Sequence, residues 1–126
     1  MPLDRTLALG THLLVELYEC DAAALDDVAG IELAMVEAAL AGGATIIDRR
    51  FHRFAPHGVS GVVIIAESHL TIHTWPEHAY AAIDVFTCGS SVDTEACAAS
   101  LRERLQSKRH TTVSLDRGPL AHLRGS

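Results

Sequence analysis

Six segments of the chain carry the pattern of hydrophobic and polar positions that is typical of β-strands: alternation with a period of two, or a short run of β-branched and aromatic residues. They are residues 12–18, 44–54, 61–66, 69–75, 80–87 and 110–115. Short breaks separate three of them, at Glu67-Ser68 and at Pro76-Glu77-His78. Because strands joined by such short connections pair antiparallel, we expect a mainly antiparallel sheet.

One segment between the first two strands has the period of an amphipathic helix instead. Residues 30–41 place five apolar side chains on one stripe, and Gly42 with Gly43 supplies a stop at the C-terminal end. The stripe consists of Ile31, Ala34, Met35, Ala38 and Ala39. We expect this helix to lie on the sheet.

A second helix is predicted after Gly89. Ser91 is its expected N-cap, and Asp93 and Glu95 fall in the first turn, where negative charge suits the helix dipole. Apolar residues then recur at four-residue spacing, at Cys97, Leu101 and Leu105. The tail, residues 116–126, shows no periodicity and is expected to be frayed.

The predicted order is strand, helix, four strands, helix, strand. It favours an α+β fold, a two-layer sandwich in which two helices cover one face of a mainly antiparallel sheet. No repeat or linker divides residues 1–126, so a single domain is expected. Because two helices cover only one face, an apolar face or edge stays open, which favours a homodimer.

Composition narrows the classes of partner. The 126 residues are 48% hydrophobic and 21% charged, as in a folded globular protein, and a formal net charge of -6 disfavours binding to nucleic acid. Three cysteines form no C-x-x-C pair, and the first residues lack a basic segment followed by an apolar one. The longest apolar run, residues 61–66, has strand length. We therefore expect a cytoplasmic protein without a membrane span.

Reactive side chains concentrate between residues 61 and 89. In an extended strand His69, Thr71, His73 and Trp75 share one face. Taken singly, such residues have ordinary interpretations: Ser68 as a turn residue, His73 as a half-buried histidine, Cys88 as a small buried hydrophobe. Spacing alone does not choose between these and a catalytic role.

Together, however, two motifs are informative. The string ESHLTIHTWPE followed by DVFTCG resembles the prokaryotic S-adenosylmethionine decarboxylase proenzymes, which depend on a pyruvoyl group. The segments GTHLLVELYEC and FHRFAPHGVSGVV resemble the same family, in the same order, so the resemblance spans almost the whole chain. The chain departs from the family pattern at Thr11, where a basic residue is frequent, and at Glu19, where glycine is frequent.

The resemblance implies self-cleavage between Glu67 and Ser68, which would give a β chain of residues 1–67 and an α chain of residues 68–126. The Ser68 hydroxyl would attack the Glu67 carbonyl to form an ester. His73, at the position of the family's proton acceptor, would then remove the Ser68 α-proton. Ser60 corresponds to a serine implicated in this processing. The product is a covalent pyruvoyl cofactor at residue 68.

The resemblance also implies how the cofactor is used. The pyruvoyl group derived from Ser68 would form a Schiff base with the substrate amine and act as an electron sink while CO2 leaves. Cys88 corresponds to the proton donor. S-adenosylmethionine is the implied substrate, giving the aminopropyl donor of spermidine biosynthesis, and Phe54, Trp75 and Glu77 suit its adenosyl and sulfonium groups. The family assembles its site at a homodimer interface.

Two alternatives stay open. A pyruvoyl-dependent arginine or ornithine decarboxylase of the same fold would share the mechanism but needs carboxylates rather than stacking aromatic rings. An uncleaved metal-binding module would use His69, His73, His78 and Cys88, although the tight H-E-x-x-H and C-x-x-C spacings of zinc sites are absent and no metal is expected.

Overall fold

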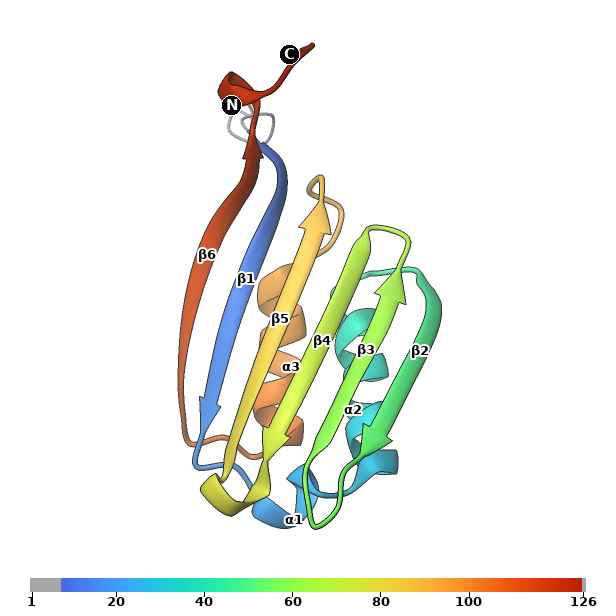
Figure 1. The fold of residues 1–126 in the computed structure, drawn as a ribbon, viewed down its shortest axis with the longest axis vertical. Helices are drawn as coiled ribbons and strands as arrows, with labels where there is room; N and C mark the ends of the chain where they lie inside the picture. Colours follow the sequence, from blue (N-terminus) through green and yellow to red (C-terminus); the bar gives the residue numbers. More distant parts are fainter. Residues whose placement is uncertain (1–7, 126) are drawn as a thin grey trace.

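A six-stranded sheet with helices on one face organises the chain (Figure 1). The computed structural model describes residues 8–125. All strand pairs are antiparallel, in the order β2-β3-β4-β5-β1-β6. The strands are β1 (Ala8–Tyr18), β2 (Ile46–Arg53), β3 (Val59–Ile65), β4 (Ser68–Trp75), β5 (Tyr80–Cys88) and β6 (Arg109–Pro119). The helices are α1 (Ala22–Leu25), α2 (Val28–Ala41) and α3 (Thr94–Arg104), with short 3-10 turns η2 (Pro76–His78) and η3 (Leu120–His122). The predicted α+β two-layer sandwich is confirmed.

The hydrophobic core lies between the sheet and helices α2 and α3. All five residues of the predicted apolar stripe on α2 are buried. A Cβ added at Gly42, which ends α2, would lie 2.4 Å from the Cys97 sulfur on α3. The glycine thus allows the two helices to approach closely, in addition to stopping the first one.

The predicted start of α3 is wrong by two residues. Its N-cap is Asp93, not Ser91: the Asp93 Oδ1 accepts the Ala96 N–H at 3.1 Å. The Asp93 N–H also donates to the Gly42 carbonyl at 2.9 Å, and the preceding Val92 is buried. The chain bends over residues 89–92, where Val92 packs into the core, and the helix begins only after this anchor.

The tail is more ordered than its sequence predicts. Strand β6 continues to Pro119, where it pairs with Ala8, and η3 follows; Ser126 lies outside the described residues. Beyond Leu115 the residues of β6 are nearly all exposed, so this part of the strand carries no hydrophobic period. The strand is formed by backbone hydrogen bonds to β1, which a side-chain pattern does not report.

A single helical turn, α1, was not predicted, because four residues are too few to show a helical period. Leu25 is fully buried and anchors this turn to the core. Asp26 follows it and faces the start of β3, where its carboxylate accepts the Gly58 N–H.

The second face of the sheet, which we call the open face, is covered by no helix of residues 8–125 (Figure 1). Strand β4 shows the alternation: Leu70, Ile72 and Thr74 are buried toward the helices, and the residues between them lie on the open face. Large apolar side chains also lie there. Val113 is 56% exposed and Ile64 43% exposed, and each pairs with a neighbour on the open face.

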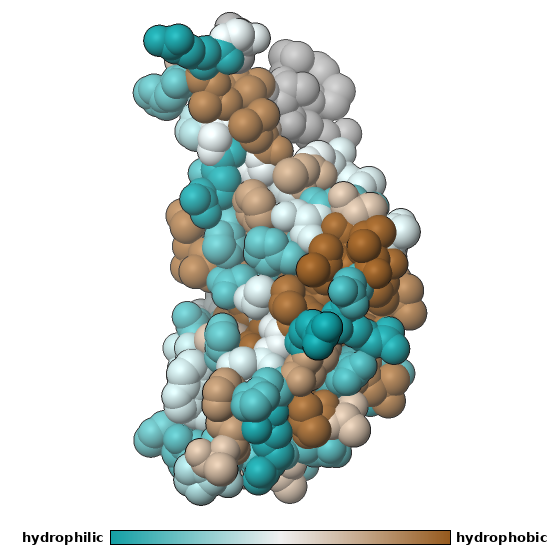
Figure 2. All heavy atoms as spheres, turned by 45° about the vertical axis from the view of Figure 1, so that its right-hand side comes forward, coloured by the Kyte–Doolittle hydropathy of each residue, from teal (hydrophilic) through white to brown (hydrophobic). Residues whose placement is uncertain are grey.

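Apolar patches are also visible around the β2 side of the molecule, between polar side chains (Figure 2). Ile47 on β2 is 63% exposed, and Leu40 at the end of α2 is 59% exposed. In the part of the chain that the structure describes, no helix is long and apolar enough to cross a bilayer.

Candidate active site

The turn between β3 and β4 holds the predicted cleavage point under local constraint. Glu67 is fixed at two atoms: its carbonyl oxygen accepts the Cys88 N–H at 2.9 Å, and its Oε1 accepts the Thr45 N–H at 3.2 Å. Ser68 follows with a φ of +150°, a region that residues other than glycine rarely adopt. The Glu67-Ser68 bond therefore lies in a strained backbone that its neighbours hold in place.

Cys88 lies beside this turn because β4 and β5 pair in register. Ser68 is opposite Thr87, and Cys88 is the next residue. Of the three free thiols, only the Cys88 residue is exposed. Cys97 is fully buried, and burial raises the pKa of its thiol to about 11; burial also raises the pKa of Cys20. The three residues Glu67, Ser68 and Cys88 form what we call the scissile group.

An imidazole to which the family resemblance assigned no role also lies near this group. The Nδ1 of His69 lies 3.5 Å from the Ser68 hydroxyl, and its ring packs against Phe86 with the centroids 5.5 Å apart. Strand alternation predicted that His69 shares a face with His73, and His69 had a role only in the alternative metal-binding module. In the sequence, only its position next to Ser68 indicated that His69 could act on the Ser68 hydroxyl.

The predicted processing residues Ser60 and His73 face each other across β3 and β4. They are register partners, and the Ser60 Oγ lies 2.8 Å from the His73 Nδ1. The His73 ring is also tilted against Trp75, with the centroids 6.4 Å apart. We call Ser60 and His73 the base group.

The scissile group and the base group lie at opposite ends of β4. Five residue steps separate Ser68 from His73 on one strand, and a rise of about 3.3 Å per residue puts their backbones roughly 16 Å apart. A proton acceptor works within hydrogen-bonding distance of the proton that it removes. Within one chain, His73 therefore cannot perform the step that the family resemblance assigns to it.

A hollow of about 340 Å³ opens at the base-group end of β4. Phe54 and Trp75 line it and are 46% and 39% exposed, and Glu77 of η2 borders it as well. The three predicted substrate contacts are thus brought together with Ser60 and His73. The other residues around the hollow are Pro56, His57, Gly58, Val59 and Thr74.

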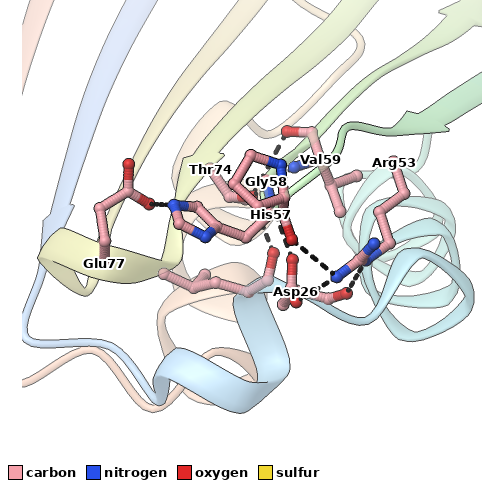
Figure 3. Close-up of polar contacts among 9 residues, drawn as sticks. Asp26, Arg53, His57, Gly58, Val59, Thr74 and Glu77 are labelled. Atoms are coloured by element: carbon pink, nitrogen blue, oxygen red, sulfur yellow. Dashed lines mark hydrogen bonds and ion pairs between the residues drawn. The ribbon is translucent and has the colours of Figure 1, made fainter.

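Polar contacts hold the walls of this hollow (Figure 3). The Asp26 carboxylate bonds both Arg53 and the Gly58 N–H, and His57 pairs with Glu77 at 3.0 Å. Neither Asp26 nor His57 was singled out from the sequence, because no motif links the turn after α1 with the loop between β2 and β3.

A second polar network lies on the open face, between the two groups. Asp84 accepts the Thr71 hydroxyl at 3.0 Å, and its other oxygen lies 3.0 Å from the His12 Nε2. Nearby, burial and then the Glu16 carboxylate raise the pKa of the Tyr80 hydroxyl, which donates to Glu16. Across residues 8–125, no three His, Cys, Asp or Glu side chains gather as metal ligands would.

Comparison with known proteins places this arrangement in a family. The sequence model for S-adenosylmethionine decarboxylase matches residues 11–118. The chain is 52% identical over 123 residues to the S-adenosylmethionine decarboxylase proenzyme of Pseudomonas aeruginosa, covering 98% of this chain and 77% of the relative. It is 56% identical over 111 residues to the proenzyme of the same name from Thermotoga maritima, covering 88% and 85%.

Solved structures agree with this assignment. The crystal structure of the adenosylmethionine decarboxylase from Aquifex aeolicus superposes with a TM-score of 0.84 at 35% identity, covering 94% of this chain and 98% of the other. An AdoMetDC monomer from Trypanosoma brucei shares the fold, with a TM-score of 0.61 at 14% identity over 82% of this chain and 45% of the other. The chain therefore belongs to the S-adenosylmethionine decarboxylase family.

Proposed function

We propose that the chain cuts itself between Glu67 and Ser68 and then decarboxylates S-adenosylmethionine through a pyruvoyl group made from Ser68. The observation that carries this proposal is the geometry of the scissile turn. The Cys88 N–H lies 2.9 Å from the Glu67 carbonyl oxygen, on which negative charge develops when a nucleophile attacks. The strained φ of Ser68 adds a second reason for this bond to react.

Cleavage starts with a rearrangement that consumes no other reactant. The Ser68 Oγ attacks the Glu67 carbonyl carbon, the carbon–nitrogen bond breaks, and the hydroxyl proton ends on the released amine, leaving an ester. The Cys88 N–H stabilises the oxyanion in between. His69 is the imidazole near the hydroxyl within the same chain and is placed to carry the proton.

The ester then opens by elimination. A base removes the α-proton of Ser68, the Glu67 carboxylate leaves, and chains of residues 1–67 and 68–126 result. Water replaces the amine of the remaining unsaturated residue, ammonia is released, and a ketone is left at residue 68. The residues present fit this group, because residue 68 already lies beside the exposed Cys88.

We assign the base to His73 of a second copy of the chain. A two-fold axis over the open face would bring the scissile group of one protomer to the base group of the other, and symmetry would create two equivalent sites. The separation of about 16 Å between Ser68 and His73 supports this homodimer. The exposed apolar side chains of the open face, including Ile64, Val113 and Leu115, support it as well.

In the decarboxylation itself, the pyruvoyl group supplies an electron sink that retains the electron pair when CO2 leaves. Cys88 returns a proton to the carbon that lost the carboxylate, which requires that the thiol be protonated at that point. Phe54 and Trp75 offer aromatic faces for the adenine and the sulfonium, and Glu77 offers an acceptor for ribose hydroxyls. The product would be the aminopropyl donor for spermidine biosynthesis.

The hollow favours this substrate over arginine or ornithine. Two aromatic side chains line it, and Glu77 supplies its one carboxylate, of which only one oxygen is not paired with His57. A guanidinium or an ammonium group would require carboxylates that are free to accept its hydrogen bonds. A cytoplasmic location, expected from the cysteine content, stays a prediction.

Intact-mass spectrometry of the purified protein tests the proposal. Two fragments that divide after residue 67, with the second one blocked at its N-terminus and lighter than a chain starting with serine, would support it. A single full-length mass after long incubation would contradict it. Release of CO2 from carboxyl-labelled S-adenosylmethionine, compared with arginine and ornithine, tests the substrate: turnover of an amino acid alone would exclude the nucleoside.

A further inference from the structure

The loop between β2 and β3 carries the aromatic wall of the hollow. It begins at Phe54 and closes at Gly58, where the Phe54 N–H donates to the Gly58 carbonyl at 2.8 Å. Gly58 has a φ of +109°, which favours glycine, and a Cβ there would lie 3.2 Å from the Thr74 carbonyl oxygen. The position of Phe54 therefore depends on how this loop is held.

Asp26 holds the loop from the side of α1. Its Oδ1 accepts the Gly58 N–H at 2.9 Å, and its Oδ2 accepts the Arg53 Nη2 at 2.7 Å. Arg53 also donates to the Asp26 backbone carbonyl at 3.2 Å and to the Pro56 carbonyl at 3.3 Å. The Gly58 N–H and then Arg53 lower the pKa of the Asp26 carboxyl, as expected for a carboxylate that accepts these bonds.

The same point of the chain also anchors the end of β4. The buried Thr74 hydroxyl donates to the Leu25 carbonyl at 2.7 Å and accepts the Val59 N–H at 2.9 Å. Leu25 and Asp26 thus connect β3, β4 and the loop to the end of α1. Figure 3 shows these contacts converging below the loop.

His57 extends the arrangement from the loop to the opposite wall. Its Nε2 lies 3.0 Å from the Glu77 Oε1, and the second carboxylate oxygen of Glu77 is directed away from the imidazole (Figure 3). One oxygen is therefore held while the other stays available. A long side chain that would otherwise sample several rotamers is restricted in this way.

We propose that Asp26 and His57 are positioning residues of the substrate site: Asp26 fixes the Phe54–Gly58 loop, and His57, carried by this loop, orients the Glu77 carboxylate toward the hollow. This inference rests on the proposed function, since it assigns the hollow to the adenosyl part of the substrate. Neither residue touches the reacting atoms, so both affect binding of substrate rather than the chemical step.

The test compares Asp26→Ala, Asp26→Asn and His57→Ala with Glu32→Ala. The control removes another exposed ion pair, that of Glu32 with Arg49 at 2.8 Å, away from the loop. In fully cleaved enzyme we expect Asp26→Ala and His57→Ala to raise KM for S-adenosylmethionine about three- to tenfold with kcat within about twofold. Asp26→Asn, which keeps an oxygen for Gly58, should fall between wild type and alanine. An unchanged KM in both alanine variants, or an equal change in Glu32→Ala, would overturn the inference.

A second measurement does not depend on activity. Trp75 is the only tryptophan of the chain and lines the hollow. In the uncleaved Ser68→Ala background, adding Asp26→Ala should shift its fluorescence emission, and adding Glu32→Ala should not. If the wild-type protein releases no CO2 from S-adenosylmethionine, the proposed function fails. The fluorescence shift would still show whether Asp26 holds the hollow in place, and the absence of a shift would show that Asp26 does not.

Discussion

Ser68 and His73 lie on the same strand, five residues apart, and the His73 imidazole points to Ser60 instead of Ser68. At roughly 16 Å along the strand, one side chain cannot take a proton from the other. The proposed reaction would therefore use Ser68 of one chain and His73 of another, and variants of the two residues can be combined in mixed dimers to test this.

Mixed dimers test this arrangement. Ser68→Ala and His73→Ala should each be inactive alone, because one lacks the cleavable serine and the other the base. Co-expressed, they form dimers in which one of the two sites has both wild-type residues. Random pairing should restore about a quarter of the sites. Mass spectrometry should then find cleaved chains that carry only the His73→Ala change.

The control for this experiment is each variant expressed alone and prepared in the same way. Cleavage of His73→Ala chains without any Ser68→Ala partner would show that His73 is not the required base. Cleavage confined to mixtures would exclude a site built within one chain.

Cys88→Ala separates the making of the cofactor from its use. The oxyanion donor at this position is the backbone N–H, which alanine retains, so we expect cleavage to proceed. Loss of the proton donor should lower kcat by about 10²- to 10⁴-fold or place the proton wrongly in the product. Turnover in deuterated water with analysis of the labelled product checks this. Cys97→Ser, at a buried thiol, is the matched control, and normal turnover by Cys88→Ala would contradict the assignment.

His69→Ala tests the imidazole next to Ser68. If His69 carries the hydroxyl proton, its removal should slow formation of the ester by about 10²-fold, and His69→Gln should behave alike. Hydroxylamine cleaves an ester, so a fall in hydroxylamine-sensitive cleavage would locate the defect before the elimination step. His73→Ala should instead accumulate the ester. Equal cleavage rates for His69→Ala and wild type would remove His69 from the mechanism.

The stability of the fold should depend on pH through Asp26. The pKa of Asp26 is lowered in the folded state, first by the Gly58 N–H and then by Arg53, so its contribution is fully present above the ordinary carboxyl pKa of about 4. The contribution is lost as pH falls through the lower folded pKa. Asp26→Asn should therefore have a lower Tm than wild type at pH 7, and the difference should shrink below pH 4.

Thermal unfolding followed by circular dichroism between pH 7 and 3 makes this comparison. Glu32→Gln, which changes an exposed ion pair, serves as the control. A difference in Tm between Asp26→Asn and wild type that stays constant over this range would show that ionisation of Asp26 does not stabilise the fold.

Much of the architecture could be predicted from local patterns. The stripe from Ile31 to Ala39 predicts the buried face of one helix. The alternation of Leu70, Ile72 and Thr74 with their neighbours indicates which face of β4 is covered. Such periods depend only on the geometry of one element. They cannot show contacts between distant segments, so they predict an end of β6 at Leu115 and an N-cap at Ser91, whereas the structure has Pro119 and Asp93.

By itself, the sequence determined the family and the order of the main elements, and it predicted which residues carry the chemistry, because the motif around Ser68 is contiguous and each element has its own hydrophobic period. Only the tertiary structure decided where those residues meet. His73 is only five residues from Ser68 in the sequence. Because the strand between them is extended, however, the two residues lie near opposite ends of β4. Conversely, Asp26 and Gly58 are 32 residues apart and share a hydrogen bond. The difference is physical: a period describes one element, whereas a site depends on how the elements pack.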